Sequence, residues 1–181
     1  VSSAVVKGLH GLGVIGDASI NQKFPSAIAV SKEPIAPILN REQIEAADKL
    51  ISSVNEETFN VCLIDGVTGS GKTEVYFEAI SAVLPMQRQV LILVPEIALS
   101  QPLLDRFEAR FGFKPTQWHS DLSNAMRRQT WRAVGEGDVA VIIGARSALF
   151  LPFLNLGLIV VDEEHEAAFK QTEGVKYQCR D

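Results

Sequence analysis

The chain is poor in the features that mark secreted, zinc-binding and membrane-spanning proteins. Its 181 residues include two cysteines, Cys62 and Cys179, which are too few for a disulfide framework and lack the C-x-x-C spacing of a zinc site. No apolar run approaches the roughly 20 residues needed to span a bilayer, and no signal-peptide pattern stands at the front. These absences favour a cytoplasmic protein with no membrane partner.

Positive charge is also scarce. The 17 lysines and arginines are outnumbered by 22 acidic residues, which gives a net charge of −5. No field of the whole molecule therefore attracts nucleic acid, and any such contact has to be local. The length allows one α/β domain with an appendage, since domains typically hold roughly 100 to 150 residues. Because the chain opens with Val1 and stops at Asp181 without a recognisable tail, we expect it to belong to something longer.

A phosphate-binding loop is the strongest pattern present. Residues 66–73 (GVTGSGKT) fit G-x-x-x-x-G-K-[ST] at every fixed position. The apolar run 61–64 before it predicts a strand, and apolar residues at helical spacing from Val75 to Val83 predict a helix after it. A Gly/Ser-rich turn with a chance Lys-Thr pair would not explain both flanking elements.

The chemistry of this loop points to a nucleotide. The glycines let backbone amides approach a polyphosphate, and the following helix directs the positive end of its dipole at the same anion. We expect the phosphates of a polyphosphate ligand to bind Gly66, Thr68, Gly69, Ser70 and Gly71. Lys72 should follow charge onto the leaving phosphate, and the Thr73 hydroxyl is placed to ligate Mg²⁺.

An acidic cluster, Asp162-Glu163-Glu164-His165, follows the apolar run 158–161. Asp162 can hold Mg²⁺ from the side opposite Thr73, and Glu163 can orient and deprotonate an attacking water. His165 could sense the γ-phosphate or cap the next helix, and the residues alone leave these two alternatives equal. A solvated helix N-terminus would also favour acidic residues.

The remaining patterns predict a mostly parallel sheet covered on both faces. Apolar runs at 90–94, 117–119, 139–143 and 158–161 alternate with helical patterns. One helix should bury Leu103, Leu104, Phe107 and Phe111. Another should bury Met126, Trp131 and Val134 and stop at Gly135. We also expect Trp118, His119 and Trp131 in or near the core. Strand-end loops of such a sheet lie along one edge, where ligands bind.

The first 38 residues form a different region. Val5, Val6 and Leu9 indicate a short helix, after which glycines and prolines interrupt the chain repeatedly. We interpret residues 1–38 as the remnant of a small domain and a linker. A helix then begins after Asn40, which forms a capping-box pattern with Gln43. Gln43 can cap this helix or pair with the edge of an adenine ring, and the capping role is favoured two to one.

The segments GVTGSGKTEVY, LVPEIALS, GARSALF and IVVDEEHE together resemble the primosomal replication-restart DNA helicases of superfamily 2. The resemblance is continuous from Leu39 to Asp181. It implies that residues 39–181 form the first RecA-like lobe, a three-layer P-loop NTPase sandwich that is truncated at its C-terminal end. Residues 1–38 would then be the end of a winged-helix-like domain and a linker.

The resemblance further implies an ATP-dependent motor that moves 3′ to 5′ on single-stranded and forked DNA, with ATP and Mg²⁺ as cofactors. Gln43 would bind the adenine, the loop residues with Lys72 and Thr73 the phosphates, and Asp162 and Glu163 the Mg²⁺ and water. Primosome proteins and single-strand-binding protein would be partners of the full-length chain. Zinc-binding cysteines, a second lobe and its ATP-contacting arginine are expected only outside the 181 residues.

Other matched positions would face DNA. They are Pro95 and Glu96, Arg146 and Ser147, and three residues of an aromatic-rich loop, Lys170, Lys176 and Tyr177. Arginine can bind a phosphate in bidentate fashion, and interleaved aromatic and basic residues suit single-strand stacking.

Two other classes of function compete with the helicase motor. A small-molecule phosphotransferase should show a lid with several arginines, and none is visible in the sequence. A noncatalytic ATP-binding assembly module would not need the intact Lys72 and Glu163. As one lobe of a two-lobed motor, the isolated chain is expected to bind nucleotide weakly and to show little or no ATPase activity.

Overall fold

The computed structural model describes residues 3–12, 14, 37–56, 58–95, 101–164, 170–171 and 177–178. The helices are α1 (Ser3–Gly11), α2 (Arg41–Asn55), α3 (Lys72–Val83), α4 (Gln101–Phe111) and α5 (Asn124–Glu136), with the 3-10 helices η1 (Leu84–Met86) and η3 (Arg146–Phe150). The strands are β1 (Gln89–Leu93), β2 (Thr116–Trp118), β3 (Val141–Gly144), β4 (Leu156–Val161), β5 (Lys170–Gln171) and β6 (Tyr177–Gln178). In these ranges no helix is long and apolar enough to cross a bilayer.

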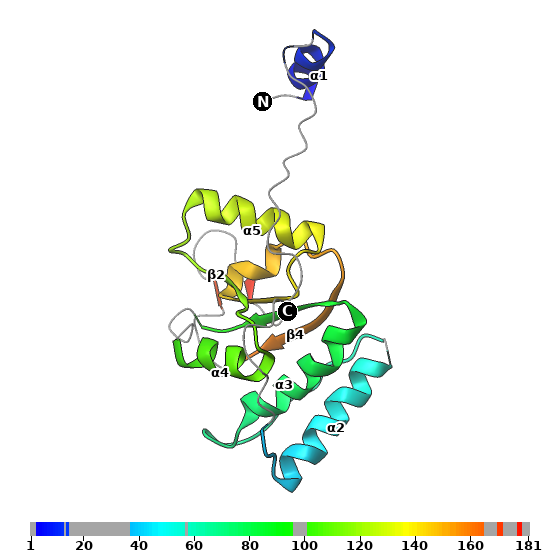
Figure 1. Cartoon of the computed structure of the whole chain (residues 1–181), viewed down its shortest axis with the longest axis vertical. Helices are drawn as coiled ribbons and strands as arrows, with labels where there is room; N and C mark the ends of the chain where they lie inside the picture. The colour runs from blue at the N-terminus through cyan, green and yellow to red at the C-terminus, as the bar shows by residue number, and fades with distance from the viewer. Residues whose placement is uncertain are drawn as a thin grey trace.

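Strands β1 to β4 form one sheet in the order β2-β3-β1-β4, and every pairing in it is parallel (Figure 1). In β1, Val90 pairs with Val141 on one side and with Leu158 on the other. Parallel neighbours need crossover connections, which α4 and α5 supply between β1, β2 and β3. The prediction of an α/β fold with parallel strands near 90–94, 117–119, 139–143 and 158–161 is therefore confirmed.

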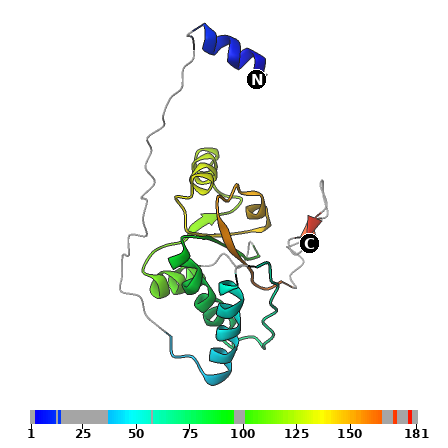
Figure 2. The same cartoon turned by 90° about the vertical axis from the view of Figure 1, so that its right-hand side faces the viewer.

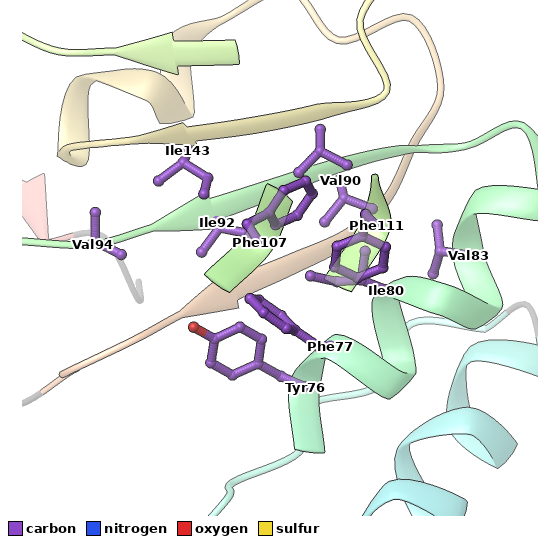
Figure 3. Close-up of a cluster of buried hydrophobic side chains, with 11 residues drawn as sticks. Tyr76, Phe77, Ile80, Val83, Val90, Ile92, Val94, Phe107, Phe111 and Ile143 are labelled. Atoms are coloured by element: carbon purple, nitrogen blue, oxygen red, sulfur yellow. The ribbon is translucent and has the colours of Figure 1, made fainter. Parts of the chain in front are cut away.

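Helices cover both faces of this sheet. Side chains alternate along a strand, so Val90 and Ile92 enter one hydrophobic cluster, while Leu91 and Leu93 enter the other. Figure 3 shows the first cluster, in which Phe77 of α3 and Phe107 of α4 pack edge to face with ring centroids 5.7 Å apart. The second cluster is closed by α5 and η3. The two turned views place α5 on one side of the sheet and α3 and α4 on the other (Figures 1 and 2).

The helix ends follow capping chemistry. The predicted capping box of α2 is confirmed, since the Asn40 side chain accepts from the Gln43 amide and the Gln43 side chain accepts from the Asn40 amide. Helix α5 does not stop at Gly135 as predicted but runs to Glu136 and ends at Gly137, whose φ is 78°. A left-handed residue ends a helix most readily when it is glycine, and Gly135 lies inside the last turn instead.

The strand predicted at 61–64 is wrong. Residues 59–67 carry no regular structure, and Val61 and Leu63 are 83% and 81% exposed. An apolar run records strand propensity, but a strand also needs a partner for its backbone groups. Within the described residues β1 is paired on both sides, by β3 and β4, and nothing pairs with the second edge of β4. The segment thus reaches the phosphate loop without regular structure, and of residues 61–64 only Ile64 is partly buried.

The prediction for the buried face of α5 is only partly right. Val134 is fully buried, but Met126 and Trp131 are 47% and 52% exposed. The buried face is centred on Thr130, Ala133 and Val134. At 3.6 residues per turn, Trp131 lies about 100° around the helix from Thr130, outside that face. Trp118 and His119 are half-buried, as expected for residues near the core.

The N-terminal region contains the expected short helix, α1, which continues through Gly8 to Gly11. Residues 15–36, where the linker is predicted, lie outside the described ranges.

Candidate nucleotide site

The phosphate loop leads directly into α3, as its pattern requires. Gly69 and Gly71 have φ of 81° and 85°, a left-handed conformation that glycine adopts without steric cost. Gly71 caps α3, and its carbonyl accepts from the amides of Glu74 and Val75. The helix therefore begins at Lys72, and its first amides face the loop. This confirms the predicted helix and its start.

Lys72 folds back onto the loop that precedes it. Its ammonium group donates to the Gly66 carbonyl at 2.6 Å and to the Val67 carbonyl at 3.3 Å. A phosphate bound in the loop would replace these neutral acceptors with a charged one, which makes a shorter and stronger hydrogen bond. The ammonium group of Lys72 thus already lies against the loop that is expected to bind a phosphate.

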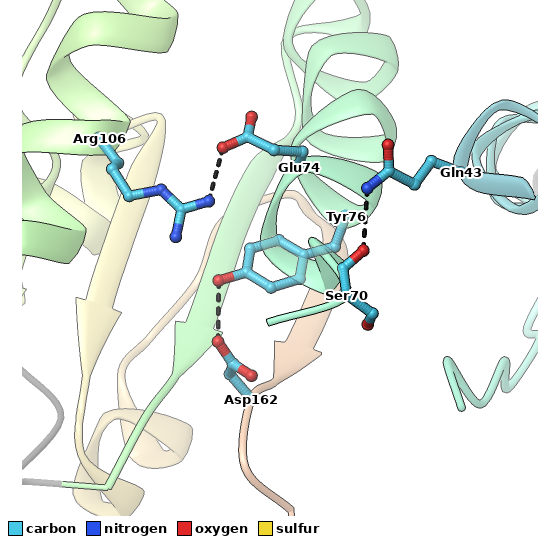
Figure 4. A network of polar contacts seen from close by, with 6 residues as sticks. All are labelled: Gln43, Ser70, Glu74, Tyr76, Arg106 and Asp162. Atoms are coloured by element: carbon cyan, nitrogen blue, oxygen red, sulfur yellow. Dashed lines mark hydrogen bonds and ion pairs between the residues drawn. The ribbon is translucent and has the colours of Figure 1, made fainter. Parts of the chain in front are cut away.

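Gln43 connects the first turn of α2 to the loop. Its Oε1 completes the capping box, while its Nε2 donates to the Ser70 carbonyl at 2.8 Å (Figure 4). The capping role of Gln43 is therefore confirmed, and the adenine contact stays a prediction. The same side chain holds the backbone of the phosphate loop, a contact between residues 27 positions apart that no local pattern predicts.

Asp162 lies at the carboxyl end of β4, and both of its carboxylate oxygens are engaged. Oδ1 accepts from the Glu163 amide at 3.0 Å, and Oδ2 accepts from the Tyr76 hydroxyl at 3.0 Å. The Asp162 amide donates to the Leu93 carbonyl, which continues the pairing of β4 with β1. The carboxylate thus projects from the sheet edge in a fixed orientation.

Glu163 has a φ of 53°, the left-handed region that few residues other than glycine occupy. Such conformations cost about 1–3 kcal/mol and cluster at functional sites. Glu163 is exposed, whereas Asp162 beside it is half-buried. The chain therefore turns sharply at Glu163, so that the neighbouring carboxylates of Asp162 and Glu163 differ in exposure.

The two ends of the candidate site meet in one pocket. It is lined by Thr73, Val94, Pro95, Arg106, Asp162 and Glu163, among others. Thr73 and Asp162 offer a hydroxyl and a carboxylate oxygen, and Mg²⁺ is usually bound by one or two such groups together with phosphates and water. The oxygen donors present therefore fit Mg²⁺ bound to a nucleotide.

Sequence reasoning did not identify Tyr76, Glu74 or Arg106 as residues near this site. Tyr76 is 3% exposed and contacts Asp162, while Arg106 of α4 forms an ion pair of 2.7 Å with Glu74 of α3 (Figure 4). The position of Tyr76 three residues after Thr73 places both on one face of α3, which is the only signal that could have singled it out. Arg106 gave no signal, because its site contact depends on how α4 packs.

The residues predicted to face DNA lie in different parts of the chain, and some lie outside the described residues. Pro95 lines the pocket with Thr73 and Asp162, on the nucleotide side. Arg146 and Ser147 begin η3 after β3, and the Ser147 hydroxyl accepts from the Trp118 indole at 3.1 Å. Lys170 and Tyr177 belong to the antiparallel pair β5-β6, of which the backbone alone is described. Glu96 and Lys176, together with the predicted phosphate sensor His165, lie outside the described residues.

Comparison with known proteins shows the family of the chain. The family pattern of the DEAD/DEAH box helicases matches residues 40–180. The chain is 47% identical over 152 residues to the replication restart protein PriA of Rickettsia felis, covering 84% of this chain and 23% of that protein. It is 42% identical to the PriA of Chlamydia pneumoniae over 183 residues (100% and 24% covered), and 36% identical to that of Bacillus subtilis over 183 residues (99% and 22% covered).

The chain therefore spans about a quarter of the length of these relatives. The helicase match covers the segment that contains the phosphate loop, the parallel sheet and Asp162, and it agrees with a RecA-like P-loop fold. The chain belongs to the DEAD/DEAH box helicase family.

Proposed function

We propose that residues 39–181 are the first motor lobe of an ATP-dependent DNA helicase that acts in replication restart. The observation that carries this proposal is the meeting of Thr73 and Asp162, from elements 89 positions apart, in one pocket beside the phosphate loop. Similarity to replication restart proteins of three bacteria supports the biological role. Residues 1–38 are then the end of a preceding winged-helix-like domain and a linker.

In this proposal the residues of the site divide the chemistry among them. The loop amides and Lys72 bind the β- and γ-phosphates, Thr73 and Asp162 hold Mg²⁺, and Glu163 orients the attacking water and accepts its proton. Mg²⁺, when bound, neutralises charge on the transferred phosphoryl group. Gln43 contacts the edge of the adenine through its side-chain amide. In the structure this amide donates to the Ser70 carbonyl.

DNA binds along the carboxyl-end edge of the sheet, where Arg146 and Ser147 follow β3. We propose single-stranded and forked DNA as the substrate, with movement 3′ to 5′. The second lobe, a zinc site and contacts with primosome proteins and single-strand-binding protein belong to the rest of the full-length protein.

Phosphate release by the full-length protein, with and without single-stranded DNA, tests the proposal. We expect DNA to stimulate release and Lys72→Ala to reduce it below about one per cent, because electrostatic groups at such sites contribute about 10² to 10³ in rate. Fork DNA binding should persist in this variant, since Lys72 contacts loop carbonyls, whereas the proposed DNA contacts are Arg146 and Ser147 of η3.

Release that depends on a small phosphate acceptor and ignores DNA would favour a phosphotransferase. ATP binding without any release, in the presence of DNA, would favour a noncatalytic assembly module. Either result would contradict the helicase assignment.

A further inference from the structure

Tyr76 joins the phosphate loop helix to the acidic end of β4. Its side chain projects from α3 beside Phe77 at the edge of the first hydrophobic cluster, where the two rings meet edge to face with centroids 5.2 Å apart (Figure 3). The ring is buried, with 3% of the residue exposed. Its hydroxyl points out of the cluster to Asp162 Oδ2, 3.0 Å away (Figure 4). The residue thus has an apolar anchor and one polar contact.

That contact is a hydrogen bond in which tyrosine is the donor. Burial of the phenol and, next, the charge of Asp162 raise the pKa of Tyr76 far above its ordinary value, while a hydrogen-bonding contact with Thr73 acts in the opposite sense. The geometry shows the same donor, since the Tyr76 hydroxyl lies 3.0 Å from Asp162 Oδ2 and a carboxylate can only accept. The hydroxyl thus contacts Asp162, which lines the same pocket as Thr73, and these are the two side chains that fit Mg²⁺.

The carboxylate of Asp162 is consequently held at both oxygens. Tyr76 holds Oδ2 and the Glu163 amide holds Oδ1. Without the phenol, one of these oxygens would lose its donor and the side chain could rotate. Groups that orient a metal ligand in this way typically contribute 10- to 100-fold to metal affinity.

We propose that Tyr76 is a positioning residue for the metal end of the nucleotide site. It fixes Asp162 relative to Thr73 before Mg²⁺ arrives, so that less ordering is needed when the metal–nucleotide complex binds. This inference rests on the proposed ATP–Mg²⁺ site and adds a residue that neither the phosphate loop nor the acidic motif contains.

The substitution that isolates this role is Tyr76→Phe in the full-length protein. Phenylalanine keeps the buried ring and removes only the hydroxyl. Thr130→Val is the matched control, because it removes a hydroxyl from a residue that is also 3% exposed but lies on α5, on the other side of the sheet. Binding of a fluorescent ATP analogue is measured in EDTA and then across a Mg²⁺ titration.

We expect Tyr76→Phe to bind the analogue normally in EDTA and to need about tenfold more Mg²⁺ for the metal-dependent gain in affinity. Thr130→Val should leave the Mg²⁺ midpoint unchanged. An unchanged midpoint in Tyr76→Phe, or an equal shift in Thr130→Val, would overturn the inference. If the wild-type protein binds no analogue at all, the proposed function fails instead, and the two failures are distinguishable.

A double-mutant cycle provides a second criterion that is independent of overall stability. Because Tyr76 acts through the Asp162 carboxylate, Tyr76→Phe should cause little further shift of the Mg²⁺ midpoint in an Asp162→Asn background. Fully additive shifts would show that Tyr76 acts by another route and would refute the positioning role.

Discussion

Three residues of the candidate site, Gly69, Gly71 and Glu163, have a positive φ. Glu163 occupies the left-handed region although it has a side chain, and it donates its amide to the neighbouring Asp162. Gly69 and Gly71 of the loop occupy the same region, which glycine adopts without steric cost because it has no Cβ. Single substitutions can test the proposed roles of neighbouring residues such as Asp162 and Glu163 separately.

Glu163→Gln in the full-length protein should bind ATP and Mg²⁺ normally but hydrolyse ATP at least about 10²-fold more slowly, because the amide keeps the shape and cannot accept a proton. Asp162→Asn should instead shift the Mg²⁺ dependence. Equilibrium nucleotide binding and phosphate release, measured side by side, distinguish these effects. Glu164→Gln serves as the matched control. Loss of nucleotide binding in Glu163→Gln would assign this residue to the metal or to the fold.

Gly71→Ala should destabilise the fold more than Gly69→Ala. Both residues have positive φ, so an alanine costs about 1–2 kcal/mol at either position. A Cβ at Gly71 would also overlap the Gln43 amide, whereas a Cβ at Gly69 meets nothing within 4 Å. The loss of the Gln43–Ser70 hydrogen bond should add about 1 kcal/mol. Urea unfolding of both variants measures the difference, and equal destabilisation would show that Gln43 does not hold the loop.

At the scale of elements, periodicity predicted most of the sheet because buried parallel strands are near-continuous apolar runs. The segments around Val90, Val141 and Leu158 show this signal and pair with one another. The run 61–64 carries the same signal but forms no strand, and Val61 and Leu63 are exposed, since apolar composition does not specify a partner strand. The prediction that Trp131 is buried was wrong for a related reason. Helical spacing groups residues on one face of a helix but does not specify which face packs against the sheet.

The site itself was predictable where one short motif carries the chemistry. Lys72, Thr73 and Asp162 follow from local patterns, since each pattern states both the residue and its element. The contacts of Gln43 with Ser70 and of Tyr76 with Asp162 join residues 27 and 86 positions apart. They depend on how α2, α3 and β4 pack, which no single segment encodes.

Gln89 should prove to be a central link between elements. This residue is 3% exposed, and its side-chain amide donates to the Val134 and Val139 carbonyls and accepts from the Leu154 and Asn155 amides. It thereby connects the start of β1 with the end of α5 and the approach to β4. Such a fully used polar side chain leaves several unsatisfied groups when it is removed.

Gln89→Leu should therefore lower the free energy of unfolding by about 3 kcal/mol or more, since each buried unsatisfied group costs about 1–3 kcal/mol. Gln101→Leu, at an exposed position of α4, is the control and should change it by less than about 0.5 kcal/mol. Denaturant titration followed by circular dichroism measures both. Similar values for the two variants would contradict the linking role of Gln89.

At the scale of the whole molecule, the 181-residue chain should be a poor motor by itself. A second lobe would supply an arginine whose counterpart in related NTPases contributes about 10³ to 10⁵ in rate, so we expect little or no turnover. The net charge of −5 should also keep DNA binding weak. If about three phosphates are neutralised, the slope of log affinity against log salt should be near −2.

Titration of the chain with labelled single-stranded DNA at several salt concentrations, beside a phosphate-release assay, measures both properties. Tight binding that does not respond to salt, or turnover equal to that of a two-lobed helicase, would mean that the chain holds a complete motor site.

Equilibrium binding of ATP to the 181-residue chain tests the central claim most directly, because the claim is that residues 66–73 and Asp162 form a nucleotide site. Isothermal titration with ATP and Mg²⁺ compares the unchanged chain with Lys72→Ala and with the control Lys49→Ala, which removes an exposed lysine of α2 and should leave binding unchanged. The account predicts weak, Mg²⁺-dependent binding that Lys72→Ala lowers at least about tenfold, since charge-assisted hydrogen bonds to phosphate contribute about 1.5–3 kcal/mol. Binding that is unaffected by Lys72→Ala, or that ignores Mg²⁺, would contradict it.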